Sequence, residues 1–179
     1  MAEAPLPARD DVRAEMERSR FMFRQLLADA SPEDLRRASR GTRWTNEQLL
    51  FHMLFGYLVV RALLWLVRGF GHLPDRVSLG YARLLDAAGR PFHVINYWGS
   101  RGGALVFRGD RMSRKMDRVI DSLQRHLDRD SDAALAIRMH FPTRWDPFFT
   151  DVMTLADVYH YATQHFDYHR QQLTLMSSD

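Results

Sequence analysis

Two histidines near the end of the chain, His165 and His169, stand four residues apart in the stretch HFDYHRQQL. If this stretch is helical, both side chains lie on one face, roughly 5–6 Å apart. A buried imidazole needs a hydrogen bond or a ligand. The pair therefore indicates either a shared metal ion or two satisfied core histidines, because apolar residues continue the same face on both sides of it: Leu155, Val158, Ala162 and Leu173.

A third histidine, His52, lies on the apolar stripe of an earlier helical stretch, LLFHMLFGYLVVRALL. Gly56 stands one turn beyond His52 on the same face. A glycine inside a helix costs about 1 kcal/mol relative to alanine, so it usually has a packing reason. We expect Gly56 to leave room beside His52.

Three core-facing histidines from two helices are the number that an open catalytic zinc site uses, with the fourth position free for water or substrate. Neutral imidazole also binds nickel, iron and copper, so the residue types leave the identity of the metal open. A zinc-protease helix is excluded, because that motif needs glutamate directly after its first histidine and Phe166 follows His165. The residues alone also leave a simpler alternative, in which each histidine is a hydrogen-bonded core residue.

Four stretches with helical periodicity must position these histidines, at about residues 12–30, 45–68, 112–127 and 154–173. Ser31, Thr45 and Thr154 are suited to cap helix N-termini. Between residues 69 and 109 the periodicity fades, with room for one short helix at 78–89. We predict an all-α fold in one domain, residues 1–179: a four-helix bundle with a long crossover between its second and third helices, which run parallel.

The composition argues against several classes of protein function. The net charge of +3 is modest, and we expect no nucleic-acid partner. The chain has no cysteine, so any thiol chemistry needs a thiol from a small molecule. The apolar run at 49–70 has the length of a membrane span, but His52, Arg61 and Arg68 interrupt it. We expect a cytoplasmic protein, no membrane partner, and a buried helix at this run.

The stretch RWTNEQLLFHMLFGYL, followed after some hundred residues by HFDYHRQQL, resembles the DinB-like superfamily of four-helix-bundle metalloproteins. The likeness covers most of the chain, including the helix order, the long crossover and the final histidine pair. It implies that His52, His165 and His169 form a metal triad at one end of the bundle. The chain departs from the pattern by its aromatic insert PFHVINYWGSRGG and its loop PTRWDPFF.

The resemblance implies thiol-dependent isomerisation or thiol transfer, because the superfamily includes mycothiol-dependent maleylpyruvate isomerase and bacillithiol transferases. It also includes members without assigned activity. The leading hypothesis is a metal-dependent S-transferase or isomerase that uses a low-molecular-weight thiol such as mycothiol. Zinc is the first expected metal, with nickel or iron as alternatives. Two further hypotheses stay open: a biosynthetic enzyme that uses metal-activated water or a Lewis acid, and a non-catalytic metal-binding stress protein.

The expected partners are a small-molecule substrate and a low-molecular-weight thiol, with a homodimer left open. We expect a pocket over the metal, bordered by YWGSRGG (residues 97–103) and TRWDPFF (residues 143–149). Tyr161 stands one turn before His165 and is expected to donate a hydrogen bond near the metal. The other candidate substrate-binding residues, suited to hold the anionic end of a cofactor, are Arg144, Trp145 and Arg170.

Overall fold

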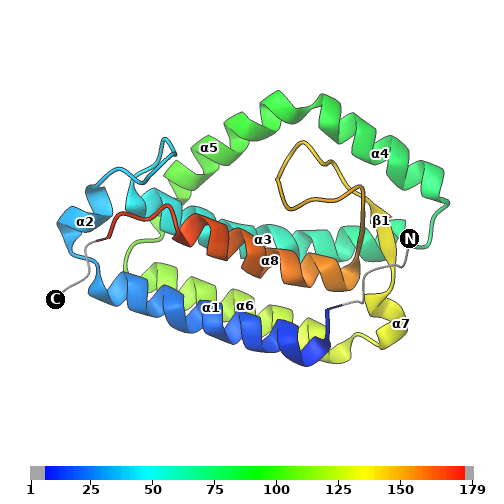
Figure 1. Ribbon diagram of the computed structural model, residues 1–179, viewed down its shortest axis with the longest axis horizontal. Helices are drawn as coiled ribbons and strands as arrows, with labels where there is room; N and C mark the ends of the chain where they lie inside the picture. The colour runs from blue at the N-terminus through cyan, green and yellow to red at the C-terminus, as the bar shows by residue number, and fades with distance from the viewer. Residues whose placement is uncertain (1–6, 176–179) are drawn as a thin grey trace.

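The computed structural model describes residues 7–175, apart from the side chains of residues 90–93. Its described part is almost entirely helical, with one small antiparallel sheet (Figure 1). The elements are, in chain order, α1 (Arg9–Asp29), α2 (Pro32–Arg36), α3 (Asn46–Phe70), α4 (Asp75–Ala87), α5 (Gly89–Val106), α6 (Asp110–Arg129), α7 (Asp132–Leu135), β1 (Arg138–His140), β2 (Val152–Thr154) and α8 (Leu155–Arg170).

The N-termini of three helices are fixed by capping boxes that the sequence predicted. Ser31 caps α2, Thr45 caps α3 and Thr154 caps α8. In each box the cap hydroxyl accepts the N–H of the third helical residue, whose side chain accepts the cap N–H in return. These caps set where α3 and α8 begin, and thereby the register of the histidines that they carry.

Four long helices, α1, α3, α6 and α8, form the bundle and confirm the predicted all-α fold. Figure 1 shows α3 and α6 running in one direction, with α1 and α8 running in the other. The core lies between them and is filled by aliphatic and aromatic side chains from all four helices, including Phe23, Leu54, Ile120 and Phe166. Because α3 and α8 are antiparallel neighbours, the early residues of α3 meet the late residues of α8.

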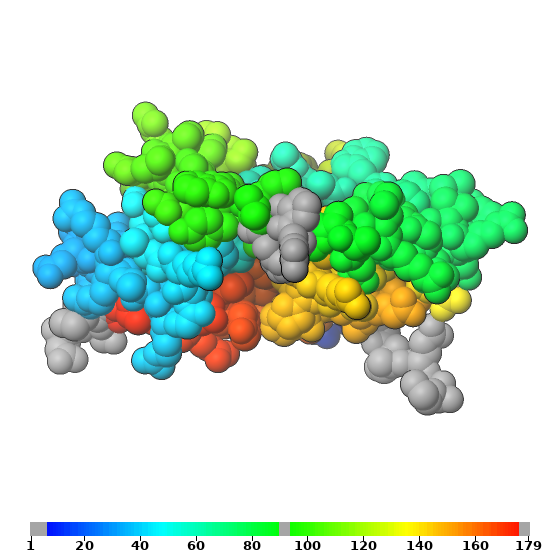
Figure 2. Space-filling model, turned by 90° about the horizontal axis from the view of Figure 1, so that it is seen from above, coloured from blue at the N-terminus to red at the C-terminus, as the bar shows by residue number. Residues whose placement is uncertain are grey.

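The crossover between α3 and α6 differs from the prediction. Residues 69–109 were expected to be largely aperiodic with one short helix, but they form two helices, α4 and α5, that arch over the bundle (Figure 1). Seen from above, α4, α5 and the loop between β1 and β2 cover much of one face of the molecule, beside the segment that joins α2 to α3 (Figure 2). The two-stranded sheet pairs Arg138 with Thr154 and holds both ends of this loop together.

Helix α3 is the apolar run that could be mistaken for a membrane span. By length and composition it could cross a membrane, but 56% of its most apolar window is buried inside the protein. Most residues in the first three turns of this helix are buried, among them Leu49, Leu50, Met53 and Leu54. This burial is what a central core helix requires, and it agrees with the expected buried helix.

Candidate metal centre

His52 lies near the start of α3 and projects toward the end of α8. Its side chain is 5% exposed, and its Nε2 atom lies 3.2 Å from Nε2 of His169. Its other ring nitrogen, Nδ1, lies 3.1 Å from the hydroxyl oxygen of Ser100 on α5. The indole of Trp44 covers one face of the ring, with a centroid distance of 4.4 Å. His52 is thus held on three sides.

The other two histidines lie one turn apart on α8, as their spacing predicted. Nδ1 of His169 donates a hydrogen bond of 2.7 Å to the amide oxygen of Gln172, which leaves the Nε2 lone pair free to face His52. The His165 ring lies 4.9 Å from His52 and 4.5 Å from His169, centroid to centroid. One nitrogen from each histidine can be chosen such that all three lie within 4.8 Å of one another.

The surroundings of the three rings keep them neutral, the form that binds metals. Burial lowers the pKa of His52 from 6.5 to about 3, with a smaller contribution from the nearby His169. Burial, together with His52 and His169, holds the pKa of His165 well below its ordinary value. The pKa of His169 is also lowered by burial, although its bond to Gln172 and the carboxylate of Asp146 oppose the shift.

Two details fit a cation between these rings. Nε2 of His52 and Nε2 of His169 lie 3.2 Å apart, a spacing that suits either a shared proton or a shared metal, and ideal tetrahedral coordination with bonds of about 2.1 Å places two nitrogens about 3.4 Å apart. Nδ1 of His165 is also buried, with no hydrogen-bond partner among the described residues. An unpaired buried nitrogen is costly, and metal coordination would satisfy it. The residues present therefore fit a divalent transition metal.

Gly56 has the predicted role of a spacer, and the side chain that it admits is that of His165. A Cβ atom at position 56 would meet three atoms of the His165 ring, the nearest being Nδ1 at 2.6 Å. The room that was expected beside His52 is occupied by the His165 ring, which lies 4.9 Å from His52, because helix α8 brings His165 to the level of Gly56. The glycine within the helical stretch thus indicated a close packing contact, and the ring that packs against it comes from α8.

A carboxylate missing from the sequence-based candidates lies at the same site. Asp146, in the loop between β1 and β2, has its Oδ2 atom 4.0 Å from Nε2 of His165. The hydroxyl of Tyr161 donates a hydrogen bond of 2.9 Å to that oxygen. Burial, and next the charge of Asp146, raise the pKa of Tyr161 well above 10, so this hydroxyl stays protonated. Tyr161 was expected to donate near the metal, and it donates to the acidic neighbour of the triad.

A cavity opens beside His52 and His165. Its wall includes Trp145, whose indole nitrogen donates to the carbonyl oxygen of Leu85, and Asp146. Residues 143–149 thus border the cavity in part, as expected for this loop. None of residues 97–103 is among the described lining residues, whereas Asn96 just before them is. Residues 97–103 instead reach the site through Ser100, whose hydroxyl lies 3.1 Å from Nδ1 of His52.

The two predicted arginines lie outside the cavity wall. Arg144 is exposed, and its backbone N–H donates to the carboxylate of Asp86. Arg170 is exposed and lies 3.9 Å from the carboxylate of Asp167. Their role in holding an anionic cofactor stays a prediction, which requires their side chains to reach the cavity mouth from outside.

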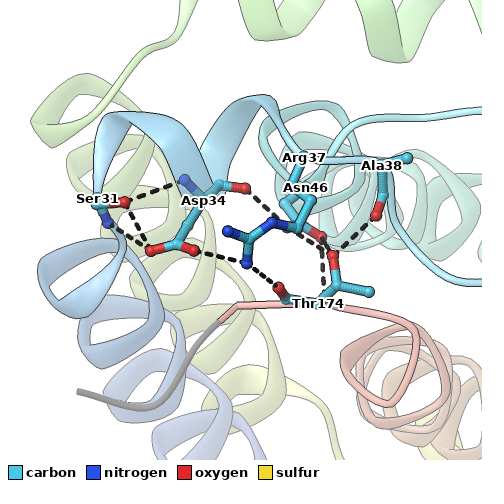
Figure 3. A network of polar contacts seen from close by, with 6 residues as sticks. All are labelled: Ser31, Asp34, Arg37, Ala38, Asn46 and Thr174. Carbon is cyan, nitrogen blue, oxygen red and sulfur yellow. Dashed lines mark hydrogen bonds and ion pairs between the residues drawn. The ribbon is translucent and has the colours of Figure 1, made fainter. Parts of the chain in front are cut away.

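A polar network ties the segment after α8 to α2 and to the start of α3 (Figure 3). The buried amide of Asn46 donates to the carbonyl oxygen of Asp34 at 2.8 Å and to the hydroxyl of Thr174 at 3.0 Å. The backbone N–H of Thr174 donates back to Asn46 Oδ1 at 3.1 Å. The segment after α8 is thereby tied to the start of α3, and Gln172 is held where it can accept from His169.

Comparison with known proteins agrees with this geometry. A family model described as the DinB superfamily matches residues 15–173, which is most of the chain. No curated protein and no solved structure matches it. The matched span contains α3, α6, α8, most of α1 and the three clustered histidines, an arrangement that fits a metal-binding protein. The chain therefore belongs to the DinB superfamily.

Proposed function

We propose that His52, His165 and His169 bind one divalent transition metal, zinc first, in an enzyme that uses a low-molecular-weight thiol. The observation that carries the metal proposal is the approach of two Nε2 atoms to 3.2 Å with both Nδ1 atoms engaged elsewhere. Three neutral nitrogen ligands leave one coordination position open. The sites of structural zinc usually have four protein ligands, so a three-histidine set favours a catalytic role.

The thiol part of the proposal rests on family resemblance and on the chemistry of the site. When bound, a divalent metal supplies positive charge that favours deprotonation of a coordinated thiol. The protein contributes a dry environment, because His52 and His165 are almost fully buried and the adjoining cavity is mainly apolar. In such an environment electrostatic interactions are stronger than in water. Asp146, anchored by Tyr161, is placed to orient a donor group of the reactant.

The proposed partners are an apolar small-molecule substrate and a thiol such as mycothiol, whose anionic end would contact Arg144 or Arg170 at the surface. Trp145 would contact the substrate in the cavity. A cytoplasmic location follows from this use of a reduced thiol. No nucleic-acid or membrane partner is proposed, and a homodimer is compatible with the active site lying within one bundle.

Metal analysis of the purified protein, followed by thermal-shift and conjugation assays with mycothiol, bacillithiol and glutathione, tests the proposal. We expect about one metal ion per chain, and a thiol that both raises the melting temperature of the metal-loaded protein and supports conjugation of an electrophile. His165→Ala and His169→Ala should lose metal and turnover together. His126→Ala, which changes a histidine on α6, serves as the control and should keep both.

If the metal is bound but no thiol shifts the melting temperature or supports turnover, the thiol hypothesis is wrong. The remaining candidate would then be metal-dependent chemistry without a thiol, such as hydrolysis or Lewis-acid catalysis. If the wild-type protein shows no turnover at all and loss of metal only lowers its stability, a structural metal in a stress protein is the better account.

A further inference from the structure

The cavity beside the triad is long and follows one stripe of α3. From the histidine end outward, its α3 wall consists of His52, Phe55, Gly56, Val59, Leu63 and Leu66. Successive members are one to four positions apart and share one face of the helix. At a rise of 1.5 Å per residue, the stripe from residue 52 to residue 66 extends over about 21 Å. The cavity is therefore a channel that leads away from the triad.

Polar groups are concentrated at one end of this channel. Asp146 lies beside His165, and Asn96 stands one helical turn from Ser100, the hydrogen-bond partner of His52. Oδ1 of Asn96 is buried, with no hydrogen-bond partner among the described residues. A buried acceptor in this state needs a donor, and a ligand group at the histidine end would supply one.

The rest of the channel wall is apolar and comes from the elements that cover α3. The residues on this side are Tyr81, Leu85, Met139, Phe141, Pro142, Trp145 and Phe149. The far end is marked by Tyr81, whose ring stacks on Phe70 at the C-terminal end of α3, with a centroid distance of 4.8 Å. Among the described residues of the lining, the carboxylate and the amide are both at the histidine end.

The volume of the channel sets its width. It measures about 80 Å³, and a water-sized group needs about 10–15 Å³ of such space. Roughly six such groups therefore fit along the roughly 21 Å of helix. Spread along this length, the space is narrow and suits a slender group such as an alkyl chain.

We propose that the channel binds the unbranched apolar tail of the substrate, whose polar head carries an N–H or O–H donor and lies at the histidine triad beside Asn96. The inference deepens the proposed function by naming the substrate class, and it rests on that function only for the placement of the head. The tail is recognised by burial of its methylene groups along Phe55, Val59 and Leu63. Each buried methylene strengthens binding by a factor of about four.

Two series of linear probes test the inference by calorimetry on the metal-loaded protein. The first consists of alkyl hydroxamates from acetohydroxamate to decanohydroxamate, which combine a metal-chelating head with N–H and O–H donors. The second consists of 1-alkanols from butanol to decanol, which have no chelating head. In both series we expect the dissociation constant to fall about fourfold per methylene and then to level off when the channel is full. The heat capacity change should become more negative with chain length.

Val59→Phe should block the channel, and Ala62→Phe adds the same ring at an exposed position of α3 as the control. Val59→Phe is expected to abolish the chain-length dependence, whereas Ala62→Phe retains it.

If acetohydroxamate binds but longer chains bind no better, the channel inference is overturned and the metal proposal stands. If the alkanols show the dependence but no hydroxamate binds more tightly than its alkanol, the channel stands and the metal proposal fails. Absence of the dependence in wild-type protein for both series overturns the inference without any variant.

Discussion

Gly56 on α3 lies directly against the imidazole of His165 on α8, so closely that a Cβ atom at position 56 would stand 2.6 Å from Nδ1 of that ring. Real Cβ atoms essentially never approach a ring nitrogen to this distance. The glycine therefore determines how near the two helices come at the level of the triad. Because Gly56 has no side chain, it offers no side-chain hydrogen-bond donor or acceptor to the His165 ring.

Gly56→Ala should consequently weaken metal binding. The new methyl group must displace the His165 ring, and a misplaced ligand or supporting group typically costs 10- to 100-fold in metal affinity. We expect a loss of metal affinity within that range when the affinity is measured by competition with a chromophoric chelator. Gly69→Ala is the matched control, since it lies on the same helix with no atom within 4 Å of the added Cβ. It should leave metal affinity unchanged. Equal affinities for the two variants would contradict the spacer role.

The bond between His169 and Gln172 gives a second prediction. Gln172→Ala removes the acceptor, 2.7 Å from Nδ1 of His169, that fixes which nitrogen faces His52. Loss of such an orienting partner should lower metal affinity about 10-fold or more while the protein stays folded. Gln171→Ala changes the exposed neighbour and serves as the control. Cobalt-substituted protein provides the readout, because its visible spectrum reports ligand geometry. Identical spectra and affinities for the two variants would refute the role of Gln172.

The sequence predicted the elements whose signals are local. The apolar stripes located the four bundle helices, the cap residues located their starts, and the spacing of His165 and His169 placed them on one face. It failed for α5, because glycines in that stretch were interpreted as loop residues. The structure shows another reason for one of them: a Cβ at Gly103 would lie 2.0 Å from the ring of Phe51 on α3. Close helix packing outweighed the low helix propensity of glycine.

The site residues that escaped prediction belong to segments far from the histidines in the chain. Ser100 reaches His52 from the crossover, and Asp146 reaches His165 from the loop before α8. Neither has a spacing relative to the triad that periodicity can reveal, since both contacts arise only when the arch and the loop fold onto the bundle. A buried serine between glycines in a segment taken for a loop carried no local signal.

Acidification should destabilise the metal-free protein through the triad. The folded-state pKa of His52 is about 3, below the value of about 6.5 in an unfolded chain. Between these values the unfolded chain binds the additional proton, so stability is greatest above pH 6.5 and falls as the pH drops toward 3. Each such histidine contributes a slope of about 1.4 kcal/mol per pH unit in this window.

Urea unfolding of chelator-treated protein at several pH values from 7 to 4.5 measures this slope. His52→Gln keeps a polar side chain but removes one titrating ring, so its slope should be smaller than that of the wild type. The comparison also cancels the contribution of carboxylates, which both proteins share. A variant slope equal to the wild-type slope would show that His52 takes up protons equally in the folded and unfolded states.

Asn46 should couple overall stability to the metal site, because its buried amide joins Asp34 to Thr174 through three hydrogen bonds (Figure 3). Asn46→Ala leaves the Asp34 carbonyl and the Thr174 N–H without these partners, and we expect a loss of about 2–3 kcal/mol in the free energy of unfolding. The freed segment carries Gln172, so His169 loses its fixed orientation and metal affinity should fall as well.

Glu47→Ala is the control in the same first turn of α3. Its carboxylate pairs only loosely with the exposed Arg108, at 3.7 Å, so the change should stay within about 0.5 kcal/mol. Hydrogen exchange resolves the two effects, with faster exchange at residues 171–175 expected in Asn46→Ala alone. A variant that loses stability but keeps slow exchange there and full metal affinity would show that the network supports the bundle and not the triad.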